Sequence, residues 1–144
     1  MLPSFSDYII IIAVLLIIVL IVLIGALYNM YYNLRRQDTK WKAIASSKLN
    51  AIQTNSRLSL ENKIVALDKL LEYTLQHYFG NYGDKISEIL KKQSKSFSDV
   101  ELDGIWLSRK IVTQLTGPVQ YGGNSINLEN TLNIYTKYIK KYMR

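Results

Sequence analysis

The chain has 144 residues and a formal net charge of +7, with one histidine and no cysteine. The absence of cysteine excludes disulfides and thiolate chemistry, and the lone His77 excludes metal sites and catalytic sets built from several histidines. After an apolar N-terminal run, about 110 residues remain, which is enough for one small domain with a modest core.

The first predicted element is a membrane anchor. Residues 8–27 form an uninterrupted apolar run without a charge. At ~1.5 Å rise per residue, a helix of this length spans the ~30 Å hydrocarbon core of a bilayer. No lysine or arginine precedes the run, and the run is longer than the apolar region of a signal peptide. We therefore expect residues 1–30 to be an uncleaved transmembrane anchor and the chain to cross the membrane once.

A basic segment follows the anchor. Its cations form a predicted membrane-surface patch, consisting of Arg35, Arg36, Lys40 and Lys42. Positive charge stays on the cytoplasmic side, so we expect the N-terminus outside and the C-terminal domain in the cytoplasm, at an inner or plasma membrane. The same cations suit the anionic lipids of the inner leaflet. Residues 31–55 are predicted to be a basic juxtamembrane helix, or stalk.

Four amphipathic segments come next, and each is predicted to be a helix. They cover about residues 58–79, 84–92, 98–115 and 127–142. The first has a single apolar stripe at helical spacing, made of Ile64, Leu67, Leu71, Leu75 and Tyr78. No segment shows the alternation of a strand. We predict an all-α protein, in which a single transmembrane helix carries a small cytoplasmic four-helix bundle over residues 56–144.

Local signals mark the ends of these helices. Gly80 is a natural left-handed stop for the first of them, and Asp84 is the predicted cap of the second. Ser98 and Glu101 have the spacing of a capping box at the start of the third. Gly104, inside that third helix, indicates close approach by a neighbour such as a dimer mate.

Two charged residues fall on apolar faces of the predicted helices. Asp68 lies one turn after Ile64, and Arg109 lies one turn after Ile105. A buried charge must be paired, because leaving it alone costs several kcal/mol, so we predict that Asp68 and Arg109 are partners, directly or through water. Two interpretations stay open. The pair either fixes the register of two helices, or indicates that Arg109 lines a functional groove.

The soluble part resembles a known family. The stretches IVALDKLLEYTL, a G-x-x-G turn, EILKK and FSDVELDGIWLSRKIVTQ, followed by an amphipathic helix, are similar to small bacterial proteins with an N-terminal anchor and a HEPN-like helical domain. The resemblance covers about residues 41–144. Enzymes of this class are metal-independent ribonucleases, whose Arg and His from an R-x4-6-H motif meet at a dimer interface.

The resemblance implies a role for three residues. It places Arg109 at the family arginine, Lys110 at the polar partner and Gln114 where the family has its histidine. Glutamine cannot exchange a proton near neutral pH, so it cannot serve as the general acid or base. The resemblance therefore implies a degenerate HEPN-like bundle that keeps the fold and the dimer but carries no catalytic residue.

Three functional hypotheses are consistent with these patterns. The leading one is a membrane-anchored, non-enzymatic interaction or scaffold module, which binds a second copy or another protein through a groove that includes Arg109, Lys110 and Gln114. The second is a membrane-tethered RNA-binding protein or metal-independent ribonuclease. The third is a structural or assembly subunit of a larger membrane complex.

Composition adds detail to these hypotheses. RNA binding would use the basic C-terminus, where lysines alternate with Tyr135, Tyr138 and Tyr142. No cofactor or metal site is predicted. The acids of the third helix, Asp99, Glu101 and Asp103, fall in its first turn, where the helix dipole favours them without a metal.

Overall fold

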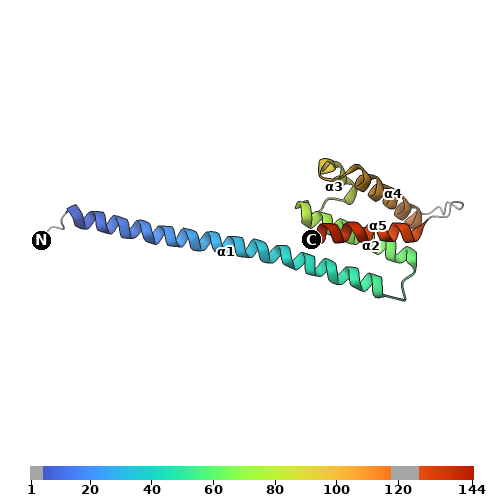
Figure 1. Cartoon of the computed structure of the whole chain (residues 1–144), viewed down its shortest axis with the longest axis horizontal. Helices are drawn as coiled ribbons and strands as arrows, with labels where there is room; N and C mark the ends of the chain where they lie inside the picture. The colour runs from blue at the N-terminus through green and yellow to red at the C-terminus, as the bar shows by residue number, and fades with distance from the viewer. Residues whose placement is uncertain (1–4, 118–126) are drawn as a thin grey trace. The chain divides into compact units, whose positions relative to one another are not determined.

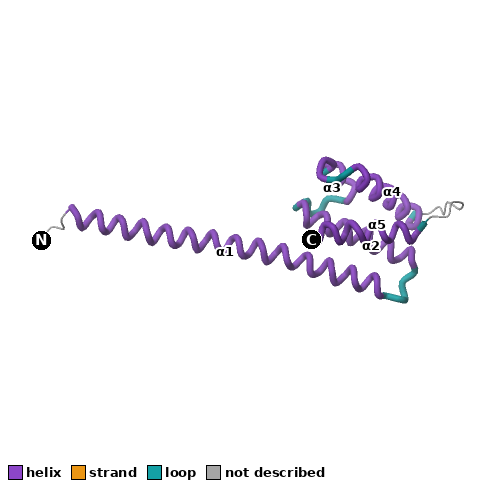
Figure 2. Tube along the Cα trace, viewed as in Figure 1, coloured by secondary structure: helices purple, strands orange, loops and turns teal. Residues whose placement is uncertain are grey.

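The computed structural model describes residues 5–117 and 127–144. Every regular element within these ranges is a helix, which confirms the predicted all-α class (Figure 2). The chain divides into two compact units, Met1–Lys40 and Trp41–Arg144. The boundary differs from the predicted one, because the bundle begins inside the segment that was expected to be a separate stalk.

The first unit is the N-terminal part of α1, a helix that runs without a break from Phe5 to Thr54 (Figure 1). Large apolar side chains cover it on every side between residues 8 and 27, and each of them is at least half exposed. Among the described helices, α1 is the one that is long and apolar enough to cross a membrane, judged by length and composition.

The second unit begins with the C-terminal turns of α1. Trp41, Ala45 and Leu49 recur every four residues and are buried in the core, with 6%, 0% and 4% of their surface exposed. The more apolar Ile44 is 46% exposed on another face of the helix. The second half of the predicted stalk is therefore part of the bundle, and a small alanine marks its buried face.

The other helices of this unit are α2 (Leu60–Phe79), α3 (Ile86–Lys92), α4 (Asp99–Thr116) and α5 (Leu128–Met143), with a short 3-10 turn, Ser94–Ser96, before α4. Helices α2 and α5 form the central pair, α4 packs on both of them, and α3 packs on α2 (Figure 1). The side chains fully enclosed between these helices include Ile64, Leu67, Leu71, Leu75, Ile105, Tyr135 and Ile139.

Two of the predicted helix ends are confirmed. The Ser98 side chain accepts a hydrogen bond from the Glu101 backbone N–H at 3.3 Å, and Glu101 Oε2 accepts from the Ser98 N–H at 3.0 Å, which completes the capping box. Gly80 ends α2 in the left-handed region, at φ 70°. The structure thus bears out both local signals.

Two other details of the sequence interpretation are wrong. Asp84 does not cap α3, which begins two residues later with Lys85 as its N-cap. The Asp84 carboxylate instead pairs with Lys92 Nζ at 2.7 Å. Tyr78 was expected inside with the α2 stripe but is 52% exposed, because it lies in the last turn, where its ring meets Phe79 and Tyr142 edge-on.

Gly104 has a neighbour, and the neighbour lies within the same chain. A Cβ built on Gly104 would lie 3.5 Å from Tyr138 Oη and 3.6 Å from Tyr138 Cε2, which is ordinary van der Waals contact. We expect Gly104→Ala to raise the free energy of unfolding by about 0.5–1 kcal/mol, because alanine has the higher helix propensity. Thermal unfolding of the full chain, followed by circular dichroism, measures the change.

The matched control for this variant is Gly80→Ala. At φ 70° an alanine is strained, so this change lowers the stability by about 1 kcal/mol. Destabilisation by both variants would show that α4 approaches α5 more closely at Gly104 than the Tyr138 distance indicates.

Candidate functional site

Asp68 and Arg109 lie together in the part of the bundle where α2, α4 and α5 meet. Arg109 Nη1 donates to both carboxylate oxygens of Asp68, at 3.3 and 3.4 Å. Tyr135 Oη, which is buried, donates to Asp68 Oδ1 at 2.8 Å. Burial raises the pKa of Tyr135, and the neighbouring Asp68 charge raises it further, so the phenol stays protonated and donates.

The three residues of the predicted groove do not converge. Arg109 points from α4 toward Asp68, and its side chain is only 25% exposed. Lys110 is exposed, and Gln114, one turn further along α4, is half-buried. Asp68 therefore ties three helices together, because it accepts from Arg109 of α4 and from Tyr135 of α5. Lys110 and Gln114 lie toward the other side of α4.

The outer side of α4 carries an apolar surface. We name it the α4 outer face and define it by Val100, Trp106 and Leu107, with Asp103 and Lys110 beside them. The three apolar side chains are 75%, 39% and 58% exposed, and the two charged residues are exposed as well. Helical spacing places all five on the side opposite the buried Ile105, Ser108 and Val112. Large exposed apolar side chains that gather on one face often mark a surface for another molecule.

The inner side of α4 holds a second charged contact. Glu101 is 7% exposed, and its carboxylate accepts hydrogen bonds from Lys141 Nζ and from Tyr142 Oη. Burial alone would raise the pKa of Glu101, but the hydrogen bonds from Lys141 and Ser98 outweigh it and hold the pKa below its usual value.

The burial of Glu101 and of its neighbours decides two expectations from the sequence, one about the acids of α4 and one about the tyrosines of α5. Asp99 and Asp103 are exposed while Glu101 is buried, so the three acids of α4 do not share one site. Tyr135, Tyr138 and Tyr142 are buried in the core. They are therefore not free to stack on bases, as the RNA hypothesis requires.

The lowered pKa of Glu101 predicts a dependence of stability on pH. The ionised form is favoured in the folded state, so this stabilisation is complete above the pKa of the unfolded chain, near 4.5, and is lost as the pH falls through the lower folded pKa. We expect Glu101→Gln to lower the stability at pH 7 by about 1–2 kcal/mol. Thermal unfolding at pH 7 and at pH 3 measures both proteins.

The difference between the two proteins should shrink at pH 3. Glutamine can keep the capping-box hydrogen bond through its carbonyl oxygen, so the contacts that are lost are those of Oε1 with Lys141 and Tyr142. Of these, the interaction with Lys141 depends on the charge of Glu101. A difference that stays constant between pH 7 and pH 3 would show that the charge of Glu101 contributes nothing to stability.

The predicted membrane-surface patch spans the boundary of the two units. Arg35, Arg36 and Lys40 are exposed on α1 in the first unit. Lys42 belongs to the second unit, where it is half-buried and its Nζ lies 5.6 Å from the centroid of the Trp41 ring. Three of the four cations are thus exposed on their helix.

His77, the single histidine, lies in a cluster of aromatic rings. Its ring centroid is 5.6 Å from that of Trp41, 4.2 Å from that of Tyr73 and 5.1 Å from that of Tyr82. Its Nδ1 lies 2.9 Å from the Tyr73 carbonyl oxygen, which accepts a hydrogen bond from the ring. His77 therefore helps to pack α2 against the C-terminal part of α1.

The chain matches no protein-family model, no curated protein and no solved structure.

Proposed function

We propose that this protein is a membrane-anchored interaction module with no enzymatic activity. Its bundle is a degenerate HEPN-like domain held in the cytoplasm by one transmembrane span. The span is supported by the large apolar side chains of residues 8–27, which are at least half exposed in the described first unit and would be costly to leave in water. The exposed cations Arg35, Arg36 and Lys40 after the span support a cytoplasmic bundle.

The α4 outer face carries this proposal, with a second copy of the chain as its partner. A twofold axis through Leu107 would lay two α4 helices antiparallel. Asp103 of one copy would then face Lys110 of the other, because these residues lie on either side of Leu107. Val100 of one copy would meet Gln114 of the other. The face is therefore complementary to itself in charge as well as apolar at its centre.

The ribonuclease alternative has less support. Arg109 is held by Asp68, and glutamine stands in the place of the family histidine. A subunit of a larger complex would use the same α4 outer face to bind a different protein. Crosslinking distinguishes that case from the homodimer.

Disulfide crosslinking tests the homodimer, since the chain has no cysteine of its own. Leu107→Cys would place two introduced thiols beside the twofold axis, within the short range that a disulfide requires. We expect mild oxidation of the full chain in membranes to convert most of this variant to a dimer. Ser56→Cys, in the exposed turn after α1, is the matched control and should stay monomeric.

Charge exchange makes the test specific. In the Leu107→Cys background, Asp103→Lys opposes like charges and should lower the crosslinked fraction several-fold. Asp103→Lys combined with Lys110→Asp restores opposite charges and should restore crosslinking. Equal crosslinking of Leu107→Cys and Ser56→Cys would overturn the homodimer and leave a different protein as the occupant.

A further inference from the structure

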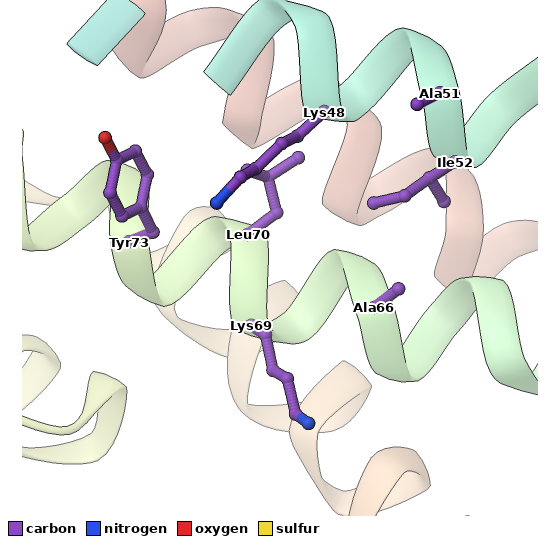
Figure 3. A pocket seen from close by; sticks show the side chains of 7 residues that line it. All are labelled: Lys48, Ala51, Ile52, Ala66, Lys69, Leu70 and Tyr73. Atoms are coloured by element: carbon purple, nitrogen blue, oxygen red, sulfur yellow. The ribbon is translucent and has the colours of Figure 1, made fainter. Parts of the chain in front are cut away.

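An open pocket lies in the bundle between the C-terminal half of α1 and the middle of α2. Figure 3 shows the side chains around it. The volume of the pocket is about 260 Å³. The side chains that line it are Lys48, Ala51, Ile52, Ala66, Lys69, Leu70 and Tyr73. The pocket is on different helices from the α4 outer face, so binding in it does not depend on the proposed dimer.

The pocket exists because each helix contributes an alanine where they face each other. Ala51 of α1 and Ala66 of α2 fill little of the space between the backbones, as Figure 3 shows. Ile52 and the buried Leu70 make the remaining wall apolar. An apolar hollow of this kind gains free energy when a hydrocarbon group replaces the water in it.

The charge of the pocket is of one sign. Lys48 and Lys69 are its charged residues, and neither forms an ion pair with a residue in the described ranges. Lys48 Nζ lies 5.0 Å from the centroid of the Tyr73 ring, at one end of the pocket (Figure 3). That end therefore presents a cation to a ligand, while the alanines lie toward the other end.

We propose that this pocket binds the alkyl chain and carboxylate of a fatty acid. The carboxylate would lie at the Lys48 end, where the ammonium group is already held over an aromatic face. The chain would run between Ala51 and Ala66 along the apolar wall. The volume is below the ~300–1,000 Å³ of pockets for drug-sized ligands, which fits a narrow chain better than a ring system.

Nuclear magnetic resonance of alanine methyl groups tests the proposal. The full chain is placed in nanodiscs of zwitterionic lipid and titrated with octanoate, which has a short chain and enters the bilayer weakly. We expect the methyl signals of Ala51 and Ala66 to shift and to reach saturation. Octylamine, with the same chain and the opposite charge, should not saturate them.

Variants separate binding in the pocket from general adsorption. Ala66→Leu fills the pocket and should abolish saturation, whereas Ala43→Leu, at an exposed position of α1, should leave binding unchanged. Lys48→Gln should weaken the binding of octanoate by up to about fivefold, the upper end of the range for an exposed ion pair. Lys91→Gln, at an exposed position of α3, should have no effect. If Ala66→Leu does not fold, Ala51→Leu fills the same space from the other helix.

The proposal would be overturned by either of two results. Shifts that never saturate would mean that octanoate only adsorbs. Equal saturation by octanoate and octylamine would mean that Lys48 does not select the charge of the ligand.

Discussion

Asp68→Ala is expected to lower the free energy of unfolding of the bundle by about 3–5 kcal/mol, the range for removing one partner of a buried ion pair. The change leaves Arg109 partly buried without an anion, and it leaves the Tyr135 hydroxyl, which is fully buried, without an acceptor. Hydrogen exchange of core amides in the full chain measures the loss.

A set of variants divides this effect among its contacts. Tyr135→Phe removes only the hydroxyl, so it should cost about 1–2 kcal/mol. In the Asp68→Ala background the same change should cost much less, because the acceptor is already gone. Additive losses in the double variant would mean that the Tyr135 hydroxyl does not depend on Asp68.

Arg109 belongs to the same contact, which limits its use in binding experiments. Arg109→Ala leaves the Asp68 carboxylate with Tyr135 as its remaining partner in the described structure, so it should also destabilise the bundle. Loss of a binding partner in that variant would not separate a binding role from a folding role. Leu107 and Lys110, which are exposed, are better positions for testing recognition.

Trp41→Ala should have an effect of similar size. Trp41 is 6% exposed and packs beside the ring of His77, and truncating a buried tryptophan typically costs about 3–5 kcal/mol. The loss should appear first as faster hydrogen exchange in residues 41–54, because this side chain is the first of the three that bury that part of α1 in the core.

Trp106→Ala is the natural control for this variant. Trp106 is 39% exposed on the α4 outer face, so its truncation should change the stability of one copy by less than about 1 kcal/mol. Equal losses at the two tryptophans would contradict the placement of Trp41 in the core.

Short-range signals in the sequence predicted the helices well. The capping box of Ser98 and Glu101 and the glycine stop at Gly80 involve residues within one or two turns of each other, so their chemistry is visible in the sequence. Asp84 shows the limit of such reasoning. Its position suited a cap, but Lys92 lies close enough in space to take its carboxylate instead.

Long-range packing could be predicted only in part. The apolar surroundings of Asp68 and Arg109 indicated that both charges need partners, and the structure places them together. The third member, Tyr135, lies 67 residues from Asp68 and looks in the sequence like one more apolar position. The burial of Ala45 was also missed, because a small residue carries little weight in a hydrophobic pattern.

The candidate sites were harder still to predict. Lys110 and Gln114 were expected beside Arg109, but successive residues of a helix point in different directions, and Lys110 faces solvent where Arg109 faces Asp68. The pocket between Ala51 and Ala66 had no signal at all in the sequence. It depends on which residues of two helices face each other, and a sequence pattern does not specify that.

The central pairing of α2 with α5 also affects how the protein is made. The ribosome synthesises α2 well before α5, at about 5–20 residues per second, so the core side chains of α2 wait some seconds for Tyr135 and Ile139. During that interval the apolar face of α2 that α5 later covers is exposed. Chaperones and other nascent chains can bind to it. Helix α5 is therefore the closing element of folding, and a ribosome that stalls before it would release an aggregation-prone fragment.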